Sequence, residues 1–144
     1  MRTLLRGGQI LDGAGAPAYQ GDVRLNGDKI EAVGALSPLP DEQVIDVSGC
    51  VVCPAFVDMH RHMDARPLLG DDMAVELRQG IATTAVGNCG FSLAPYGGSF
   101  AAEKRENDAP ILGRYPESFR FSFPEYLNAL EHSASGMNLA ALIG

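Results

Sequence analysis

Cysteine, positive charge and long apolar runs are all scarce in this sequence of 144 residues, and each scarcity excludes a class of protein. The sequence has three cysteines, a small and odd number that does not fit a disulfide framework, so we expect reduced thiols. Lys and Arg number 11 against 18 Asp and Glu and form no cluster, which argues against nucleic acid as a partner, because phosphate binding needs a basic surface. No apolar run approaches the roughly 18 residues of a membrane helix, and the opening residues break too early to form a signal-peptide core. We expect a cytoplasmic protein.

The length limits the fold as well. A chain of 144 residues is near the roughly 150 of a typical domain, but a complete (β/α)8 barrel needs roughly 200 or more. Hydrophobic residues make up 46% and charged residues 20% of the sequence, which is the balance of a folded globular protein.

Residues 1–50 are predicted to form a small β-rich domain. The segment 22–25 alternates polar and apolar residues, as a half-buried strand does. Asn26-Gly27 follows it and is the favoured two-residue hairpin turn, because both positions tolerate a positive φ. The segment 29–34 is the expected returning strand.

From residue 51 the sequence predicts an α/β fold with parallel strands. The apolar run 51–58 is typical of a strand buried on both faces, and the β-branched residues of 81–86 indicate a second buried strand. Residues 137–143 are expected to form a third strand. Residues 90–120 are predicted to form a long loop, and such loops are usually functional or mobile.

Two helices are predicted to connect these strands. The first covers residues 72–79, with Asp71 as its N-cap and Gly80 at its C-terminus. The second begins at Ser122, because Ser122 and Glu125 match a capping box. Its buried stripe is expected to comprise Tyr126, Leu127 and Leu130.

The residues with metal-binding chemistry follow the first predicted strand. Residues i and i+2 of a strand point the same way, about 6.6 Å apart, so His60 and His62 should project together and converge on one divalent ion. Asp58 and Asp64 share that parity, and we expect Asp58 to hold a ligand ring by accepting its second N–H. Two solvated histidines are the alternative interpretation, which the flanking aspartates make weaker.

Cys89 ends the second predicted strand, at the edge of the sheet where parallel α/β folds place their sites. Glycines at 87 and 90 allow an unusual turn around Asn88 and Cys89. A buried inert thiol is the alternative, but next to the two histidines a thiolate ligand is the better interpretation. Imidazole and thiolate together suit zinc.

Other candidates are weaker. Cys50 and Cys53 have a C-x-x-C spacing, but no second Cys/His pair accompanies them, so we expect two buried structural thiols. Arg66 lies close enough in sequence to the histidines to meet a substrate carboxylate.

Several of these segments resemble one family. Residues 54–62, Pro-Ala-Phe-Val-Asp-Met-His-Arg-His, resemble the first barrel strand of the amidohydrolase superfamily, and residues 80–84 its second strand. Residues 87–95, Gly-Asn-Cys-Gly-Phe-Ser-Leu-Ala-Pro, are similar to the narrower N-acyl-D-amino-acid deacylase (D-aminoacylase) branch. Residues 10–17 and 26–30 resemble the opening β-domain of that branch.

The resemblance implies a fold and a metal site. It implies a β-sandwich-like segment over 1–50 and, over 51–144, the first three strands of an incomplete metal-dependent hydrolase barrel. It implies that Cys89 is a zinc ligand and that His60 and His62 line the metal centre, with room for a second, weaker metal. The residues expected beside the metal or the substrate are Asp58, Asp64, Arg66 and Asn88.

The resemblance also implies a reaction, the hydrolysis of N-acylated D-amino acids as small-molecule substrates. Zinc would polarise the acyl carbonyl and activate water, and an aspartate would act as general base. That aspartate and two further histidine ligands belong to later barrel strands, so we expect no catalytic residue before Gly144 and an inactive isolated chain. This sequence departs from the branch at Met63, a position where the branch often has Asp.

Two alternatives stay open. One is a hydrolase of the same superfamily that acts on a cyclic amide, as dihydroorotases and hydantoinases do, although the Asn88-Cys89 turn argues against it. The other is a non-catalytic truncated module that self-associates or pairs with a missing remainder, because three parallel strands leave hydrogen-bonding edges open.

Overall fold

The computed structural model describes residues 1–143, and the chain divides into two compact units, Met1–Pro54 and Ala55–Gly144. The division lies at Pro54 rather than near residue 50, because the short strand β5 (Val51–Val52) still pairs with the first sheet. No helix among residues 1–143 has both the length and the apolar character needed to cross a membrane.

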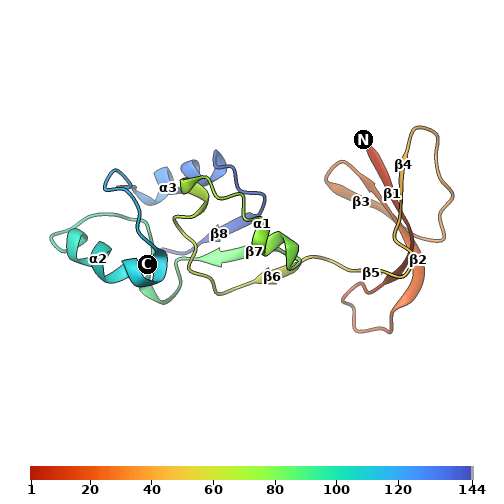
Figure 1. Ribbon diagram of the computed structural model, residues 1–144, viewed down its shortest axis with the longest axis horizontal. Coiled ribbons are helices and arrows are strands. Elements are labelled where there is room, and N and C mark those ends of the chain that lie inside the picture. Colours follow the sequence, from red (N-terminus) through yellow and green to blue (C-terminus); the bar gives the residue numbers. More distant parts are fainter. Residues whose placement is uncertain (144) are drawn as a thin grey trace. The chain divides into compact units, whose positions relative to one another are not determined.

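The first unit is a five-stranded sheet built around β1 (Arg2–Ile10), shown in red in Figure 1. β2 (Tyr19–Asn26) pairs antiparallel with β1, and β3 (Lys29–Gly34) pairs antiparallel with β2. β4 (Gln43–Asp46) and β5 pair with β1 in the parallel sense. The buried apolar side chains of this unit are Leu4, Ile10 and Val23.

The predicted hairpin is present, with its turn displaced by one residue. Asn26 pairs with Lys29 as the last residue of β2, so Gly27 and Asp28 form the two-residue loop. Gly27 has a φ of +62°, which a glycine adopts without strain.

A buried ion pair closes the loop before β4. Arg24 on β2 donates to both carboxylate oxygens of Glu42, at 2.6 and 3.2 Å, and to the carbonyl of Ser37 at 2.7 Å. Glu42 also accepts the N–H of Leu39 at 3.0 Å. The hydrogen bond from Arg24 holds the pKa of the Glu42 carboxyl below its usual value.

The second unit is a three-stranded parallel sheet in the order β6 (Phe56–Asp58), β7 (Ile81–Val86) and β8 (Asn138–Ala141). The connections hold α1 (Ala74–Arg78), α2 (Ala101–Leu112) and α3 (Phe123–Glu131), together with the short 3-10 turns η1 (Pro67–Leu69) and η2 (Asn88–Gly90). The predicted alternation of strands and helices with parallel pairing is confirmed in this unit.

The predicted continuous strand over 51–58 is wrong. Pro54 has no N–H to give to a ladder, and it separates β5 from β6. Phe56 and Val57 are 61% and 58% exposed, so β6 is not buried on both faces in this chain. Cys50 and Cys53 are exposed as well, contrary to the expectation of buried thiols.

The helices differ from the prediction in two places. The segment expected to be a loop contains α2, which has Pro110 inside it and no helical apolar period in its sequence. Helix α1 is shorter than predicted, because Met73 before it has a φ of +61°. Asp71 and Asp72 accept the N–H groups of Met73 and Ala74 two residues on, instead of capping a helix at residue 72.

Helix α3 begins as predicted. Ser122 and Glu125 form the capping box, each side chain accepting the backbone N–H of the other. Tyr126 and Leu130 are buried, but Leu127 is 42% exposed and was wrongly placed in the stripe.

Two buried clusters lie in the second unit. One contains Tyr126 and Leu130 with Ala65, Leu93 and Ala94. The other contains four apolar residues from four segments, namely Met63, Met73, Val86 and Met137. The residue after His62 is therefore anchored in a core.

Candidate metal centre

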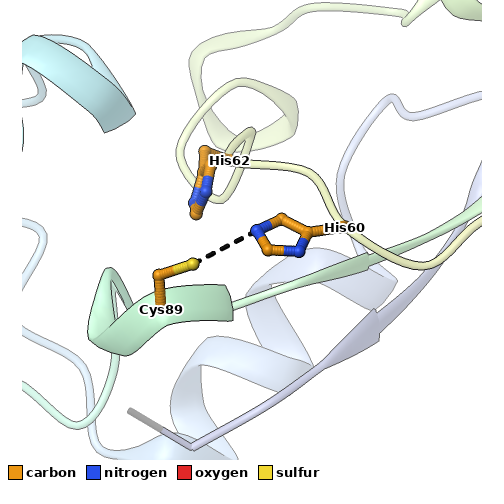
Figure 2. Close-up of side chains that lie close together, drawn as sticks. All are labelled: His60, His62 and Cys89. Atoms are coloured by element: carbon orange, nitrogen blue, oxygen red, sulfur yellow. Dashed lines mark hydrogen bonds between the residues drawn. The ribbon is translucent and has the colours of Figure 1, made fainter.

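Three side chains of the second unit meet at one point (Figure 2). His60, His62 and Cys89 each offer one ligand atom, and these atoms all lie within 4.8 Å of one another. The Sγ atom of Cys89 is 3.2 Å from Nε2 of His60. The two imidazole rings meet edge to face, with their centroids 5.3 Å apart.

The histidines converge for a different reason from the one the sequence indicated. β6 ends at Asp58, so His60 and His62 lie on an irregular segment after the strand, and strand parity does not orient them. Phe91, which follows η2, contacts the His62 ring edge to face at 5.5 Å between centroids.

Cys89 reaches the histidines through a strained turn. Its φ of +58° and ψ of +20° are left-handed values, which cost a non-glycine residue of order 1–3 kcal/mol. Gly87 before it has a φ of +80°, and a Cβ atom there would lie 2.4 Å from the carbonyl oxygen of Leu142. The glycine therefore permits both the turn and the close approach of the chain after β8.

The three residues fit a metal ion by their chemistry. Two imidazoles and a thiolate are ligands that zinc prefers. The Nδ1 atom of His62 is buried and, within residues 1–143, has no hydrogen-bond partner, whereas buried polar atoms are normally satisfied. His60 and Cys89 are exposed, which leaves one side of the cluster open to further ligands.

Asp58 holds the backbone rather than an imidazole ring. Its Oδ1 atom accepts the N–H of His60 at 3.0 Å, and its Oδ2 atom lies 3.6 Å from a guanidinium nitrogen of Arg61. Asn88 acts in a similar way, because its Nδ2 donates to the carbonyls of Arg61 at 3.2 Å and Ala85 at 2.9 Å. Both side chains fix the segment that carries the histidines to the ends of β6 and β7.

Asp64 lies in the core beneath the cluster. It is 1% exposed, and neither carboxylate oxygen has a hydrogen-bond partner of normal geometry among the described residues. Burial raises the pKa of this carboxyl to about 6, although backbone N–H groups such as that of Leu93 act in the opposite direction. Its backbone carbonyl accepts the hydroxyl of Tyr126 at 3.0 Å.

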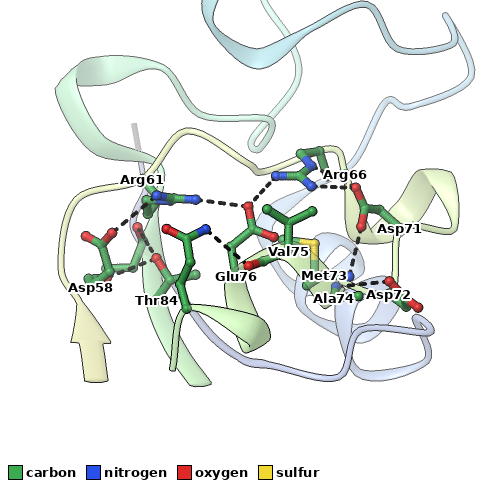
Figure 3. A network of polar contacts seen from close by, with 12 residues as sticks. Asp58, Arg61, Arg66, Asp71, Asp72, Met73, Ala74, Val75, Glu76 and Thr84 are labelled. Carbon is green, nitrogen blue, oxygen red and sulfur yellow. Dashed lines mark hydrogen bonds and ion pairs between the residues drawn. The ribbon is translucent and has the colours of Figure 1, made fainter. Parts of the chain in front are cut away.

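Arg66 is engaged in an ion-pair network (Figure 3). It donates to Asp71 at 2.8 Å and to Oε1 of Glu76 at 2.7 Å, and Arg61 donates to the same Oε1 atom at 2.9 Å. Burial acts to raise the pKa of Glu76, but hydrogen bonding from Arg66 and the charges of Arg66 and Arg61 keep it below its usual value.

Glu76 is the residue that sequence reasoning missed. It is 2% exposed on a helix of five residues, and a single glutamate in so short a helix has no pattern that predicts burial. A signal was available in Arg61 and Arg66, two positive charges next to a buried segment that need a carboxylate.

The chain is similar to enzymes of known structure. No protein-family model matches it. The D-aminoacylase of Alcaligenes xylosoxydans xylosoxydans is 38% identical over 144 residues, which cover 98% of this chain and 28% of that enzyme. A solved D-aminoacylase with a binuclear metal centre matches with a TM-score of 0.81 and 39% identity, over 99% of this chain and 29% of the other. The N-acyl-D-glutamate deacylase of Bordetella bronchiseptica, complexed with zinc and a phosphonate inhibitor, matches with a TM-score of 0.76 and 33% identity at the same coverage. The chain spans about 28% of the length of the curated relative.

Proposed function

Since the chain belongs to the N-acyl-D-amino-acid deacylase branch of the amidohydrolase superfamily and matches its N-terminal portion, we propose that it supplies part of the metal centre of an enzyme that hydrolyses N-acylated D-amino acids. The observation that carries this proposal is the convergence of His60, His62 and Cys89 within 4.8 Å. The similarity to D-aminoacylase supports a linear amide as the substrate.

We assign zinc to this centre, with Cys89 as the thiolate ligand and His60 and His62 as imidazole ligands. Zinc held by these residues would supply a Lewis acid, which polarises an acyl carbonyl and lowers the pKa of a water molecule. The open side of the cluster has room for additional ligands and for a second, weaker metal. We expect the general base to be a carboxylate outside residues 1–143.

The other residues of the site orient the ligands. Asp58 and Asn88 fix the backbone on either side of His60 and Arg61. Phe91 packs on the His62 ring and excludes water from one edge of it. In this proposal, β6, β7 and β8 are the first three strands of a metal-dependent hydrolase barrel, and their parallel order supports that assignment.

Metal analysis tests the ligand assignment. The 144-residue chain is incubated with zinc and desalted, and the bound zinc is measured. Bound zinc is expected in the wild-type chain and in a Cys50→Ala control, which removes an exposed thiol of the other unit. Loss of zinc is expected in Cys89→Ala. Unchanged zinc in Cys89→Ala would contradict the assignment.

A chimaera tests the substrate class. This chain replaces the corresponding N-terminal portion of a D-aminoacylase, and the zinc-loaded protein is offered an N-acetyl-D-amino acid, its L enantiomer and dihydroorotate. Hydrolysis of the D substrate is expected, with little of the other two. Hydrolysis of dihydroorotate alone would assign the protein to the cyclic-amide hydrolases instead. The isolated 144-residue chain is expected to show no turnover in the same assay.

A further inference from the structure

The two histidines lie on a segment that has little regular structure to hold it. Residues 59–63 belong to no helix or strand. Ordering each such residue costs roughly 1–2 kcal/mol of backbone entropy, so a preformed site needs contacts that restrain this segment. The residues between β6 and η1 are held by contacts with other segments.

Arg61, the residue between the histidines, makes most of these contacts. Its N–H donates to the carbonyl of Ala85 at 3.1 Å, and its carbonyl accepts Nδ2 of Asn88 at 3.2 Å. Its guanidinium group donates to Oε1 of Glu76 at 2.9 Å (Figure 3). The orientation of Arg61 thus determines how its two neighbours are presented to Cys89.

Glu76 is placed to hold both ends of the segment. Its Oε1 atom accepts hydrogen bonds from both Arg61 and Arg66. The bond from Arg66, which lies four residues after His62, is 2.7 Å long. The Glu76 side chain is 3% exposed, whereas the two arginine side chains are 31% and 36% exposed. The fixed carboxylate on α1 is therefore the buried anchor, and the arginines are the groups that it immobilises.

We propose that Glu76 is a positioning residue of the metal centre, which holds Arg61 and Arg66 so that His60 and His62 face Cys89 before any metal binds. This inference rests on the metal site proposed above. Without the carboxylate, Arg61 keeps only Asp58, at 3.6 Å, as an ionic partner, and Arg66 keeps Asp71. Backbone bonds and the burial of Met63 still hold the segment, but the side chains of His60 and His62 then sample more orientations, and zinc must select the competent one.

The test compares two buried glutamates that each bind arginine. Glu76→Gln removes the charge that holds Arg61 and Arg66, and Glu42→Gln removes the charge that holds Arg24 in the other unit. Zinc affinity of the 144-residue chain is measured by competition with a chromophoric chelator. We expect roughly a tenfold or greater loss of affinity for Glu76→Gln and no change for Glu42→Gln. Equal affinities in the two variants would overturn the inference.

A double-mutant cycle separates positioning from general destabilisation. Arg61→Met removes the link between Glu76 and the histidines while the Glu76–Arg66 pair remains. In the Arg61→Met background, Glu76→Gln should weaken zinc binding by clearly less than the roughly tenfold loss expected in the wild-type chain, because one of the two arginine links is already gone and coupled residues are not additive. A full tenfold effect in that background would show that Glu76 does not act through Arg61.

Hydrogen exchange without metal distinguishes failure of this inference from failure of the proposed function. The Arg61 amide is protected by its bond to Ala85, and in Glu76→Gln it should exchange about tenfold faster, whereas Glu42→Gln leaves it unchanged. A wild-type chain that binds no zinc refutes the proposed function, and the exchange rates still decide whether Glu76 holds the segment. Unchanged exchange of the Arg61 amide in folded Glu76→Gln would overturn the positioning role of Glu76. If Glu76→Gln does not fold, unchanged exchange in Arg61→Met would overturn it instead.

Discussion

Each unit of the molecule buries one glutamate against arginine, and the two arrangements serve different ends. In the first unit Glu42 takes two hydrogen bonds from a single guanidinium group and a third from the N–H of Leu39, and the result is a closed loop beside β4. In the second unit Glu76 offers one oxygen to two arginines, Arg61 and Arg66, and leaves its other oxygen without a partner among the described residues. The same ionic chemistry therefore stabilises a fold in one place and orders a ligand segment in the other.

The two ion pairs differ because their arginines lie in different backbone environments. Arg24 lies inside a strand, where the ladder already fixes its backbone. Arg61 lies between two histidines on irregular backbone, where its side chain is a main restraint. A buried ion pair is by itself weak evidence for a gain in stability, so its role is judged from its position in the chain.

The largest expected effect comes from truncating the cores of the two units. Leu4→Ala in the first unit should lower the free energy of unfolding by about 2–5 kcal/mol, and Tyr126→Ala in the second by about 3–5 kcal/mol, since both residues are fully buried. Only Tyr126→Ala should also weaken zinc binding, because the Tyr126 hydroxyl holds the carbonyl of Asp64, two residues after His62. Denaturant unfolding and zinc titration measure the two effects. An equal loss of zinc affinity in Leu4→Ala would break the functional division between the units.

A pair of glycines gives an intermediate effect. Gly87→Ala should destabilise the second unit by more than roughly 1–3 kcal/mol, because the strain of a positive φ is joined by a clash with the carbonyl of Leu142. Gly27 in the first unit also has a positive φ, +62°, but there is open space around it. Gly27→Ala should therefore lower the free energy of unfolding by only roughly 1–2 kcal/mol. Thermal unfolding monitored by circular dichroism compares the two. A larger loss of stability in Gly27→Ala than in Gly87→Ala would show that the clash with Leu142 does not destabilise the variant at position 87.

The smallest effect is a pH dependence confined to the first unit. Asp22 accepts the N–H groups of Leu36 and Gly7, and these bonds lower the pKa of its carboxyl. A lowered pKa means that stability is present above the unfolded value, near pH 3.9, and is lost as the pH falls below it through the folded value. Denaturant unfolding between pH 6 and 3, in steps of about one unit, should show a shallower acid decline in Asp22→Asn than in the wild-type chain. Zinc binding at neutral pH should be unaffected, and a change there would contradict the assignment of Asp22 to the first unit alone.

Much of the fold follows from local pattern. The β-branched segment 81–86 forms β7, because its residue types favour an extended backbone. The Ser122–Glu125 capping box opens α3, because its contacts join residues near in sequence. Helix α2 was missed for the converse reason. Its sequence has no apolar period, and Pro110 argues against a helix, so no local pattern predicts it.

The candidate site was only partly predictable. Its three ligand residues were identified from their chemistry and from the ends of two predicted strands, but the geometry that joins them was not. The strand ends at Asp58, so the histidines owe their direction to Arg61 and to Glu76, which is distant in sequence. Arg66 pairs with Glu76 and Asp71, contacts that the sequence did not predict, and its expected contact with a substrate stays a prediction.

The left-handed backbone of Cys89 creates a conflict between folding and metal binding. Among the twenty amino acids, glycine suits a φ of +58° with least strain, and glycine has no sulfur. Selection for stability alone would therefore draw position 89 towards glycine, whereas selection for the metal keeps the thiol. The residue that would give the proposed metal centre its thiolate is therefore one that the local backbone accommodates poorly.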